Sequence, residues 1–204
     1  MVSSDAVEKG VFTPADVGKL IAVADEDWSG LILAGFYTGA RLGDLSRLKQ
    51  QDIDRKRLSL RFGQAKTKQF IEIPLHPELE KWLLSRPESK PDNPVFTSLC
   101  GTSISGVSGL SMRFKALMEK AGIVVAVTRK SGTKGRNRSS LSFHSLRHSF
   151  NSAMANAGVS QELRQRLTGH ASKAINDRYT HTELETLRKA VELVPTITDP
   201  EASR

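Results

Sequence analysis

The sequence predicts a mainly helical α+β domain that holds one small antiparallel β-sheet. Apolar residues recur at helical spacing in several separate segments, whereas two short segments alternate apolar and polar residues as strands do. The composition, 38% hydrophobic and 25% charged over 204 residues, is typical of a soluble globular protein that is long enough to bury a core. The chain shows no internal repeat and no strong internal boundary.

The first third of the chain predicts three helices. The first begins with Thr13 as N-cap and Pro14 at the first helical position, where the missing N–H has no intrahelical partner to lose. The side chains expected to face the core from this helix are Leu20, Ile21 and Val23. Residues 29–38 are apolar nearly all round, which indicates a buried helix that Gly39 ends. A short helix over residues 42–48 is expected to follow.

The small sheet is predicted next along the chain. Residues 58–62 and 70–73 alternate apolar and polar residues, and the basic turn 63–68 joins them. Helical spacing then returns in four segments, which are 77–85, 109–121, 145–157 and 161–167. Gly158 and Gly169 follow the last two segments as helix stops. Residues 182–194 carry an apolar stripe at positions i, i+3, i+7 and i+10. This tail stripe consists of Leu184, Leu187, Val191 and Val194.

Charge and targeting signals narrow the function classes. Lys and Arg number 30 against 22 Asp and Glu, a net charge of +8 that favours a polyanionic partner. The single cysteine, Cys100, excludes an internal disulfide and a CxxC metal site. The sequence has neither an apolar run long enough to span a membrane nor the apolar core of a signal peptide in its first ten residues. We therefore expect a cytoplasmic protein without membrane contact.

Three short segments concentrate residues suited to phosphodiester chemistry. They are 38–45 (TGARLGDL), 144–150 (HSLRHSF) and 167–170 (LTGH), and Tyr179 follows His170 by nine residues. Cleavage and rejoining of a phosphodiester needs a nucleophile, positive charge around the phosphoryl oxygens and a proton for the leaving group. Tyrosine, arginine, histidine and lysine can supply these functions together.

The spacing of these residues fits that chemistry. Arg41 and Arg147 can each bind two phosphate oxygens through the planar guanidinium, so together they can clamp one phosphate. His144 stands three residues before Arg147 on an expected helix, and both would share one face. A tyrosine has a free pKa near ~10 and attacks poorly without a base or a cationic setting. A lysine in a flexible turn suits the role of general acid.

Together these segments resemble the tyrosine recombinase family, which includes phage integrases and chromosome-dimer resolvases; the resemblance covers residues 12–182. It implies that Arg41 and Arg147 clamp the phosphate and that His144 is the general base or proton manager. It also implies that His170 donates a second hydrogen bond to the phosphate. Tyr179 would be the nucleophile that forms a 3′-phosphotyrosine and leaves a free 5′-hydroxyl. The expected fold is the catalytic-domain fold of that family, without metal, cofactor or ATP.

Two further residues follow from the resemblance. Lys66 is expected to be the general acid because it stands eight residues before Pro74, as the family's hairpin lysine does; Lys68 is the competitor. Asp44 occupies a site where the family usually carries Glu, and we expect it to support Arg41. Residues 128–140 form a loop with five Lys or Arg and no acid, for which contact with the DNA backbone competes with a plain solvated surface. The candidate DNA contacts are Lys68, Arg129, Lys130, Lys134, Arg136 and Arg138.

Each residue also has a simpler interpretation. Arg41 alone, after a helix-ending glycine, would be a partner of the helix C-terminus. His144 and His148 have the i, i+4 spacing of metal ligands, but Ser145 stands where the helical zinc hydrolases carry Glu, so no metal is expected. His148 is then a structural histidine. Tyr179 alone would be an ordinary half-buried tyrosine.

The resemblance implies a division of the chain and a set of partners. Residues 1–11 are expected to be a linker or the remnant of an upstream DNA-binding domain, 12–182 the catalytic domain, and 183–204 a C-terminal helix and tail. The partner is double-stranded DNA, on which a homotetramer would assemble from monomers. The tail stripe would dock on a neighbouring subunit or on its own domain. The alternative functions are a type IB topoisomerase and a DNA-binding module that has lost catalysis.

Overall fold

The computed structural model describes residues 10–65, 70–125, 127–128, 138–168 and 181–197. Its helices are α1 Pro14–Val23, α2 Glu26–Thr38, α3 Leu42–Leu45, the 3-10 helix η1 Gln50–Asp52, α4 Pro77–Ser85, α5 Leu110–Lys120, α6 Phe143–Asn156, α7 Gln161–Thr168 and α8 His181–Glu192. Its strands are β1 Ile53–Asp54, β2 Ser59–Gly63, β3 Phe70–Pro74, β4 Val127–Thr128 and β5 Arg138–Ser139. The predicted fold class, mainly helical with a small antiparallel sheet, is confirmed.

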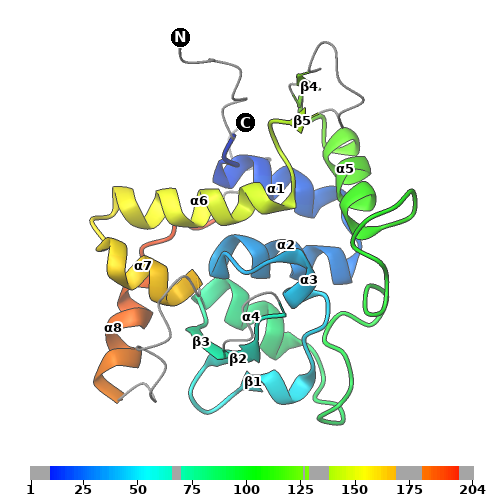
Figure 1. Ribbon diagram of the computed structural model, residues 1–204. Helices are drawn as coiled ribbons and strands as arrows, with labels where there is room; N and C mark the ends of the chain where they lie inside the picture. Colours follow the sequence, from blue (N-terminus) through cyan, green and yellow to red (C-terminus); the bar gives the residue numbers. More distant parts are fainter. Residues whose placement is uncertain (1–9, 66–69, 126, 129–137, 169–180, 198–204) are drawn as a thin grey trace.

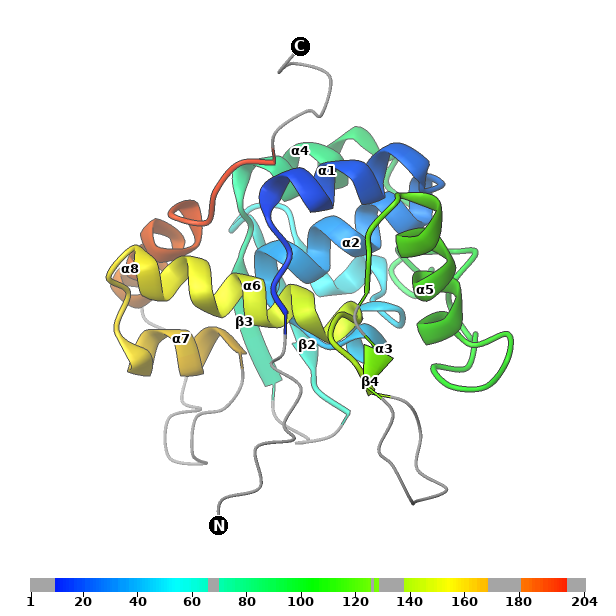
Figure 2. The same cartoon turned by 90° about the horizontal axis from the view of Figure 1, so that it is seen from above.

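Helix α2 is the centre of the fold. It contacts α1, α3, α4 and α6, and the two views in Figures 1 and 2 place it between α6 and α4. Its side chains are buried almost all round, as its apolar sequence predicts. Gly35 lets α6 approach closely, because a Cβ there would lie 2.8 Å from Phe143 and 2.9 Å from Leu146. Helix α2, which leads into the segment 38–45, therefore packs directly on α6.

Local capping signals place the first helices as predicted. Thr13 caps α1 in a capping box with Asp16, and Gly39 ends α2 in the left-handed region with φ +61°. Helix α2 begins three residues earlier than predicted, since the Asp25 carboxylate accepts a hydrogen bond from the Trp28 amide at 2.8 Å. The helix predicted over 42–48 is shorter, because tight i to i+3 hydrogen bonds continue the chain after Leu45.

The main sheet has three antiparallel strands in the order β1-β2-β3, with Leu60 opposite Ile73. The sequence indicated only two strands, because the two residues of β1 are too few to show alternation. A separate antiparallel pair, β4-β5, flanks residues 129–137. Strand β3 contacts α7 and α8, and Glu72 is buried at a position where alternation predicts exposure, whereas Phe70 on the same side of the strand is 69% exposed. Glu72 accepts a hydrogen bond from Ser59 Oγ at 2.9 Å and pairs with Arg57 at 3.2 Å.

The C-terminal helix packs on its own domain. Helix α8 lies beside β3 and α7 (Figure 1), and all four residues of the tail stripe are buried. Arg188 donates a hydrogen bond to the carbonyl oxygen of Arg57 at 2.6 Å, which ties α8 to the β1-β2 connection. The tail stripe was expected to dock on a neighbouring subunit or on its own domain, and in this single chain it packs on its own domain.

Among the described helices, none combines the length and the apolar character that a bilayer crossing requires.

Candidate active site

Arg41 lies in the short connection between α2 and α3. The left-handed turn at Gly39 directs the chain so that Arg41 becomes the N-terminal flanking residue of α3, with 22% of its side chain exposed. Its Nη1 atom lies 3.9 Å from Oδ2 of Asp44. Within the described residues neither of these two atoms has a hydrogen-bond partner. The guanidinium is thus held near a carboxylate while it retains donors for a ligand.

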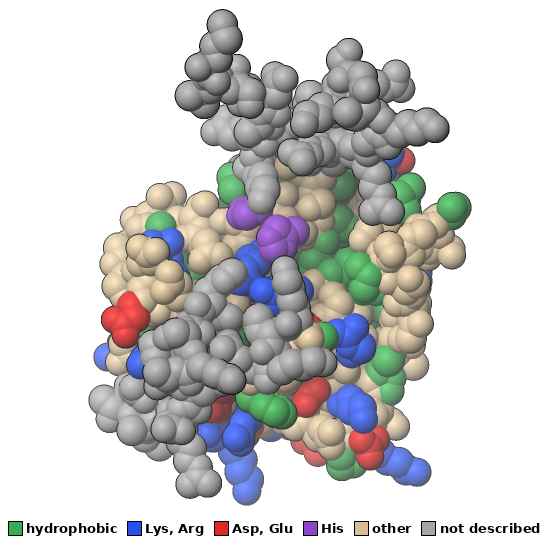
Figure 3. All heavy atoms as spheres, viewed as in Figure 1, with side chains coloured by type: hydrophobic (Ala, Val, Ile, Leu, Met, Phe, Trp, Pro, Cys, Tyr) green, Lys and Arg blue, Asp and Glu red, His purple; other side chains and the backbone are tan. Residues whose placement is uncertain are grey.

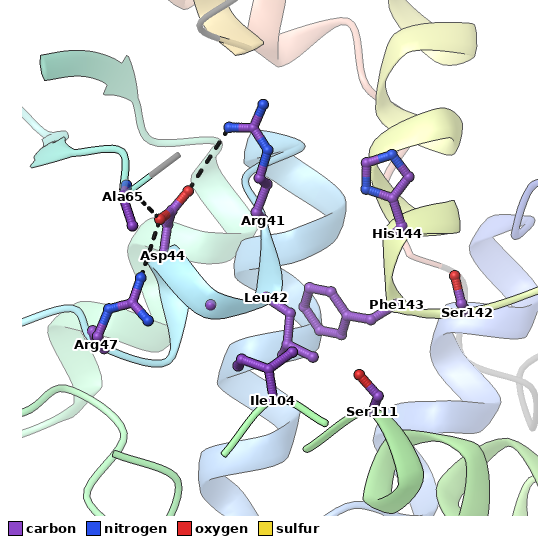
Figure 4. Close-up of a pocket in the computed structure, with 11 residues that line it drawn as sticks. Arg41, Leu42, Asp44, Arg47, Ala65, Ile104, Ser111, Ser142, Phe143 and His144 are labelled. Carbon is purple, nitrogen blue, oxygen red and sulfur yellow. Dashed lines mark hydrogen bonds and ion pairs between the residues drawn. The ribbon is translucent and has the colours of Figure 1, made fainter. Parts of the chain in front are cut away.

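Asp44 connects three parts of the site. Its Oδ1 atom accepts a hydrogen bond from the Ala65 amide at 3.0 Å and another from Arg47 Nη2 at 3.3 Å (Figure 4). The buried carboxylate therefore links α3 to the turn that follows β2. The carboxylate lies beside Arg41, and its expected support of that arginine stays a prediction.

Arg147 is almost completely buried in α6, with 3% of the residue exposed. It donates hydrogen bonds to two backbone carbonyls, from Nη1 to Gly39 at 2.8 Å and from Nη2 to Thr168 at 2.7 Å. Burial and the nearby charge of Arg41 lower the pKa of Arg147 to about 10, against the opposing charge of Asp44, so it stays cationic at neutral pH. Arg147, rather than Arg41, binds the carbonyl at the C-terminal end of α2.

His144 lies one turn before Arg147 on the same helix, and its side chain is exposed toward Arg41 (Figure 4). The ring of His148 is half-buried and meets the His144 ring edge-to-face, with centroids 4.9 Å apart. On the face seen in Figure 3, histidine side chains lie beside Lys and Arg side chains. Arg41, at the junction of α2 and α3, therefore lies near two residues of α6, namely His144 and Arg147.

A cavity of about 400 Å³ opens between α3, the start of α6 and the start of α5. Its polar lining comes from Arg41, Asp44, Arg47, Ser111, Ser142 and His144. Leu42, Ile104 and Phe143 form the apolar part (Figure 4). Sequence reasoning missed Arg47, whose i, i+3 spacing from Asp44 was a usable signal. It also missed Ser111 and Ser142, which come from separate elements and carry no such signal.

Tyr37 is one of two tyrosines in the chain and lies outside this cavity. It is fully buried in α2, and its hydroxyl donates a hydrogen bond to the carbonyl oxygen of Pro195 at 3.5 Å. Burial raises the pKa of Tyr37 well above its usual value, which disfavours the nucleophilic phenolate. Tyr37 is therefore a structural residue.

Residues 11–185 match the model of the phage integrase family. The chain belongs to this family. Tyrosine recombinase XerA from Pyrococcus horikoshii is 31% identical over 186 residues, which cover 88% of this chain and 59% of XerA. The integrase-family chain thus spans about three fifths of the length of this relative.

Solved structures of integrases share the fold. The integrase from mycobacterium phage Brujita matches with a TM-score of 0.63 and 21% identity, over 93% of this chain and 60% of that one. The Tn1549 transposon integrase, solved in complex with circular intermediate DNA, matches with a TM-score of 0.58 and 17% identity, over 91% of this chain and 66% of that one. The expected recombinase fold of the integrase-family chain is confirmed.

Several predicted residues lie outside the described residues, namely Lys66, Lys68, Arg129, Lys130, Lys134, Arg136, His170 and Tyr179. The backbone of Arg138 belongs to β5, but its side chain is also outside the description. Two of these undescribed stretches, 66–69 and 169–180, follow residues that are hydrogen-bonded to the site. Ala65 is bonded to Asp44, and Thr168 to Arg147.

Proposed function

We propose that the chain is the catalytic domain of a site-specific DNA recombinase that breaks and rejoins strands through a 3′-phosphotyrosine. The observation that carries this proposal is that Arg41 and His144 line one cavity while Arg147, buried behind them, lies near enough to feel the charge of Arg41. The charge of Arg41 adds to burial in lowering the pKa of Arg147, so the two guanidinium groups repel each other, and an anion beside both would relieve that repulsion. Family membership and the charge of +8 support a phosphodiester of DNA as that anion.

Tyr179 is the proposed nucleophile. The burial of Tyr37, the other tyrosine, supports this choice. The Tyr179 oxygen attacks the phosphorus and the 5′ oxygen leaves, which gives the tyrosyl ester and a 5′-hydroxyl. A 5′-hydroxyl then attacks the ester and releases the tyrosine. The bond energy stays in the ester, so the sequence of steps needs neither metal nor ATP.

The remaining residues manage charge and protons. Arg41, Arg147 and His170 stabilise the phosphoryl oxygens, and His144 takes the tyrosine proton. Lys66 gives a proton to the leaving 5′ oxygen, with Lys68 as its competitor. The contacts of Asp44 with Ala65 and Arg47, and its nearness to Arg41, support its role in placing that arginine.

The proposed partner is double-stranded DNA, and the related Tn1549 integrase in complex with DNA supports it. We propose that the backbone contacts include Lys68, Arg129, Lys130, Lys134, Arg136 and Arg138. On DNA, four copies would assemble. Residues 1–11 would be a linker or the remnant of an upstream domain, 12–182 the catalytic domain, and 183–204 the C-terminal helix and tail.

A nicked suicide substrate tests the reaction, because loss of the short 5′ fragment traps the covalent intermediate. We expect a protein–DNA adduct that maps to Tyr179 and disappears in Tyr179→Phe. Tyr37→Phe is the matched control and should keep the adduct, since it removes one hydrogen bond at 3.5 Å and Tyr37 does not line the cavity. Binding without any adduct would favour an inactive DNA-binding module. Relaxation of any supercoiled plasmid, without synapsis of two sites, would favour a topoisomerase.

A further inference from the structure

Gln64 joins two chain segments that are distant in sequence and end at the site. It is the residue after β2 and is 1% exposed. Its Nε2 atom donates a hydrogen bond to the carbonyl oxygen of Thr168, the last residue of α7, at 3.3 Å. The same oxygen accepts from Arg147 Nη2 at 2.7 Å. The last carbonyls of a helix have no intrahelical partner and carry partial negative charge, so Thr168 is suited to receive both donors.

The backbone next to Gln64 is fixed as well. The amide of Ala65 donates to Asp44 Oδ1 at 3.0 Å, so residues 64 and 65 are held to α7 by a side chain and to α3 by the main chain. Lys66 is the next residue in the sequence, and His170 comes two residues after Thr168. The Gln64–Thr168 bond therefore sets the distance between the starting points of the segments that carry them.

The chemistry of Gln64 separates it from the groups that act on a substrate. Its amide has no proton to give at neutral pH and no nucleophilic character, and Gln64 does not line the cavity. Burial of an amide costs free energy unless the amide is hydrogen-bonded, whereas an apolar side chain of similar size would avoid that cost. A buried glutamine at this point is explained by the position that its hydrogen bond enforces.

We propose that Gln64 is a positioning residue that holds residues 64 and 65, at the end of β2, against the end of α7, and so aligns Lys66 for proton transfer to the leaving 5′ oxygen. This inference rests on the proposed function, in which Lys66 is the general acid. A misplacement of a catalytic group by about 1 Å can lower the rate of the catalysed step by about 100-fold. Loss of the hydrogen bond should therefore impair proton donation more than DNA binding or folding.

The experiment compares cleavage of two suicide substrates by the full chain. One has the natural 5′ oxygen at the cleaved bond, and the other has sulfur there, a leaving group that needs little protonation. We expect Gln64→Met, close in size but without the amide, to cleave the natural substrate about 10- to 100-fold more slowly. It should cleave the sulfur substrate within about threefold of the unmodified chain, because proton donation is then bypassed. Gln51→Met, at an exposed glutamine, is the matched control and should cleave both substrates normally.

Each other result decides against the inference. Equal losses on both substrates would mean that Gln64 only stabilises the fold, and normal cleavage of the natural substrate would mean that its hydrogen bond is dispensable. If Gln64→Met does not fold, the same comparison with Gln64→Asn, which keeps the amide but shortens its reach, decides the matter. Failure of the proposed function itself would give a different result. The unmodified chain would then form no adduct, or Tyr179→Phe would still form one.

Discussion

The ring of Tyr37 stacks on the ring of His76, with centroids 3.9 Å apart and planes 10° from parallel. Both rings hold the segment after α8, since the Tyr37 hydroxyl donates to the Pro195 carbonyl and His76 Nε2 lies 3.2 Å from the Val194 carbonyl. The other ring nitrogen of His76 accepts from the Glu78 amide at 3.2 Å and caps α4. Only a neutral ring with its proton on Nε2 satisfies both contacts.

The first prediction is that acid weakens the fold through His76. Burial lowers the pKa of His76 below its ordinary 6.5, although the carboxylates of Glu78 and Glu192 oppose the shift. Protonation would also place an N–H against the Glu78 amide. The unfolded chain therefore binds the proton more readily, so this stability is complete above pH 6.5 and is lost as the pH falls toward the folded pKa.

Urea unfolding from about pH 5 to about pH 8 measures this effect. We expect a smaller change of the unfolding midpoint over this range in His76→Gln, whose amide does not titrate. An identical pH dependence in the two proteins would show that other groups are responsible.

The second prediction concerns the two carbonyls that Arg147 binds. Lysine has a single nitrogen and cannot hold Gly39 and Thr168 from two fixed positions, so Arg147→Lys should lose at least one hydrogen bond to a charged donor. We expect a loss of about 1.5–3 kcal/mol in the free energy of unfolding, together with a loss of adduct. Arg61→Lys, at an exposed position of β2, is the control. Equal stability of the two variants would contradict the structural part of this role.

The third prediction separates the two candidate acids. If Lys66 protonates the 5′ oxygen, Lys66→Ala should cleave natural DNA poorly and recover on the substrate with sulfur at that bond. Lys68→Ala should then cleave the natural substrate normally. Recovery by sulfur in Lys68→Ala instead would transfer the role to Lys68.

The sequence predicted the parts of the fold that local signals control. Thr13 and Gly39 cap their helices as expected, and α4 has the predicted bounds Pro77–Ser85. Local patterns cannot report contacts between distant segments. Alternation therefore gave the wrong exposure for Glu72, which is buried and meets Ser59 and Arg57.

The same limit applies to the site. Arg41, His144 and Arg147 were predicted as site residues because motifs mark them. The hydrogen bond of Gln64 to Thr168 joins residues 104 positions apart, and no motif within either segment indicates it. The sequence does not reveal which backbone carbonyls act as acceptors. Every residue has a carbonyl, and only the fold decides which one an arginine or a glutamine contacts.

The last prediction is that α8 is part of the core of the isolated chain. Leu187 and Val191 are 0% exposed, and both belong to the hydrophobic core that extends from α1 to α8. Truncation after Thr182 would therefore damage the fold, and a point variant is the sharper test. We expect Leu187→Ala to lower the free energy of unfolding by about 2–5 kcal/mol, because it leaves a cavity in a packed core. Leu193→Ala, at a leucine that is 51% exposed, should change it by less than about 0.5 kcal/mol. If both variants behave alike in urea, α8 does not dock on its own domain in solution, and the tail stripe must find its partner surface on another copy.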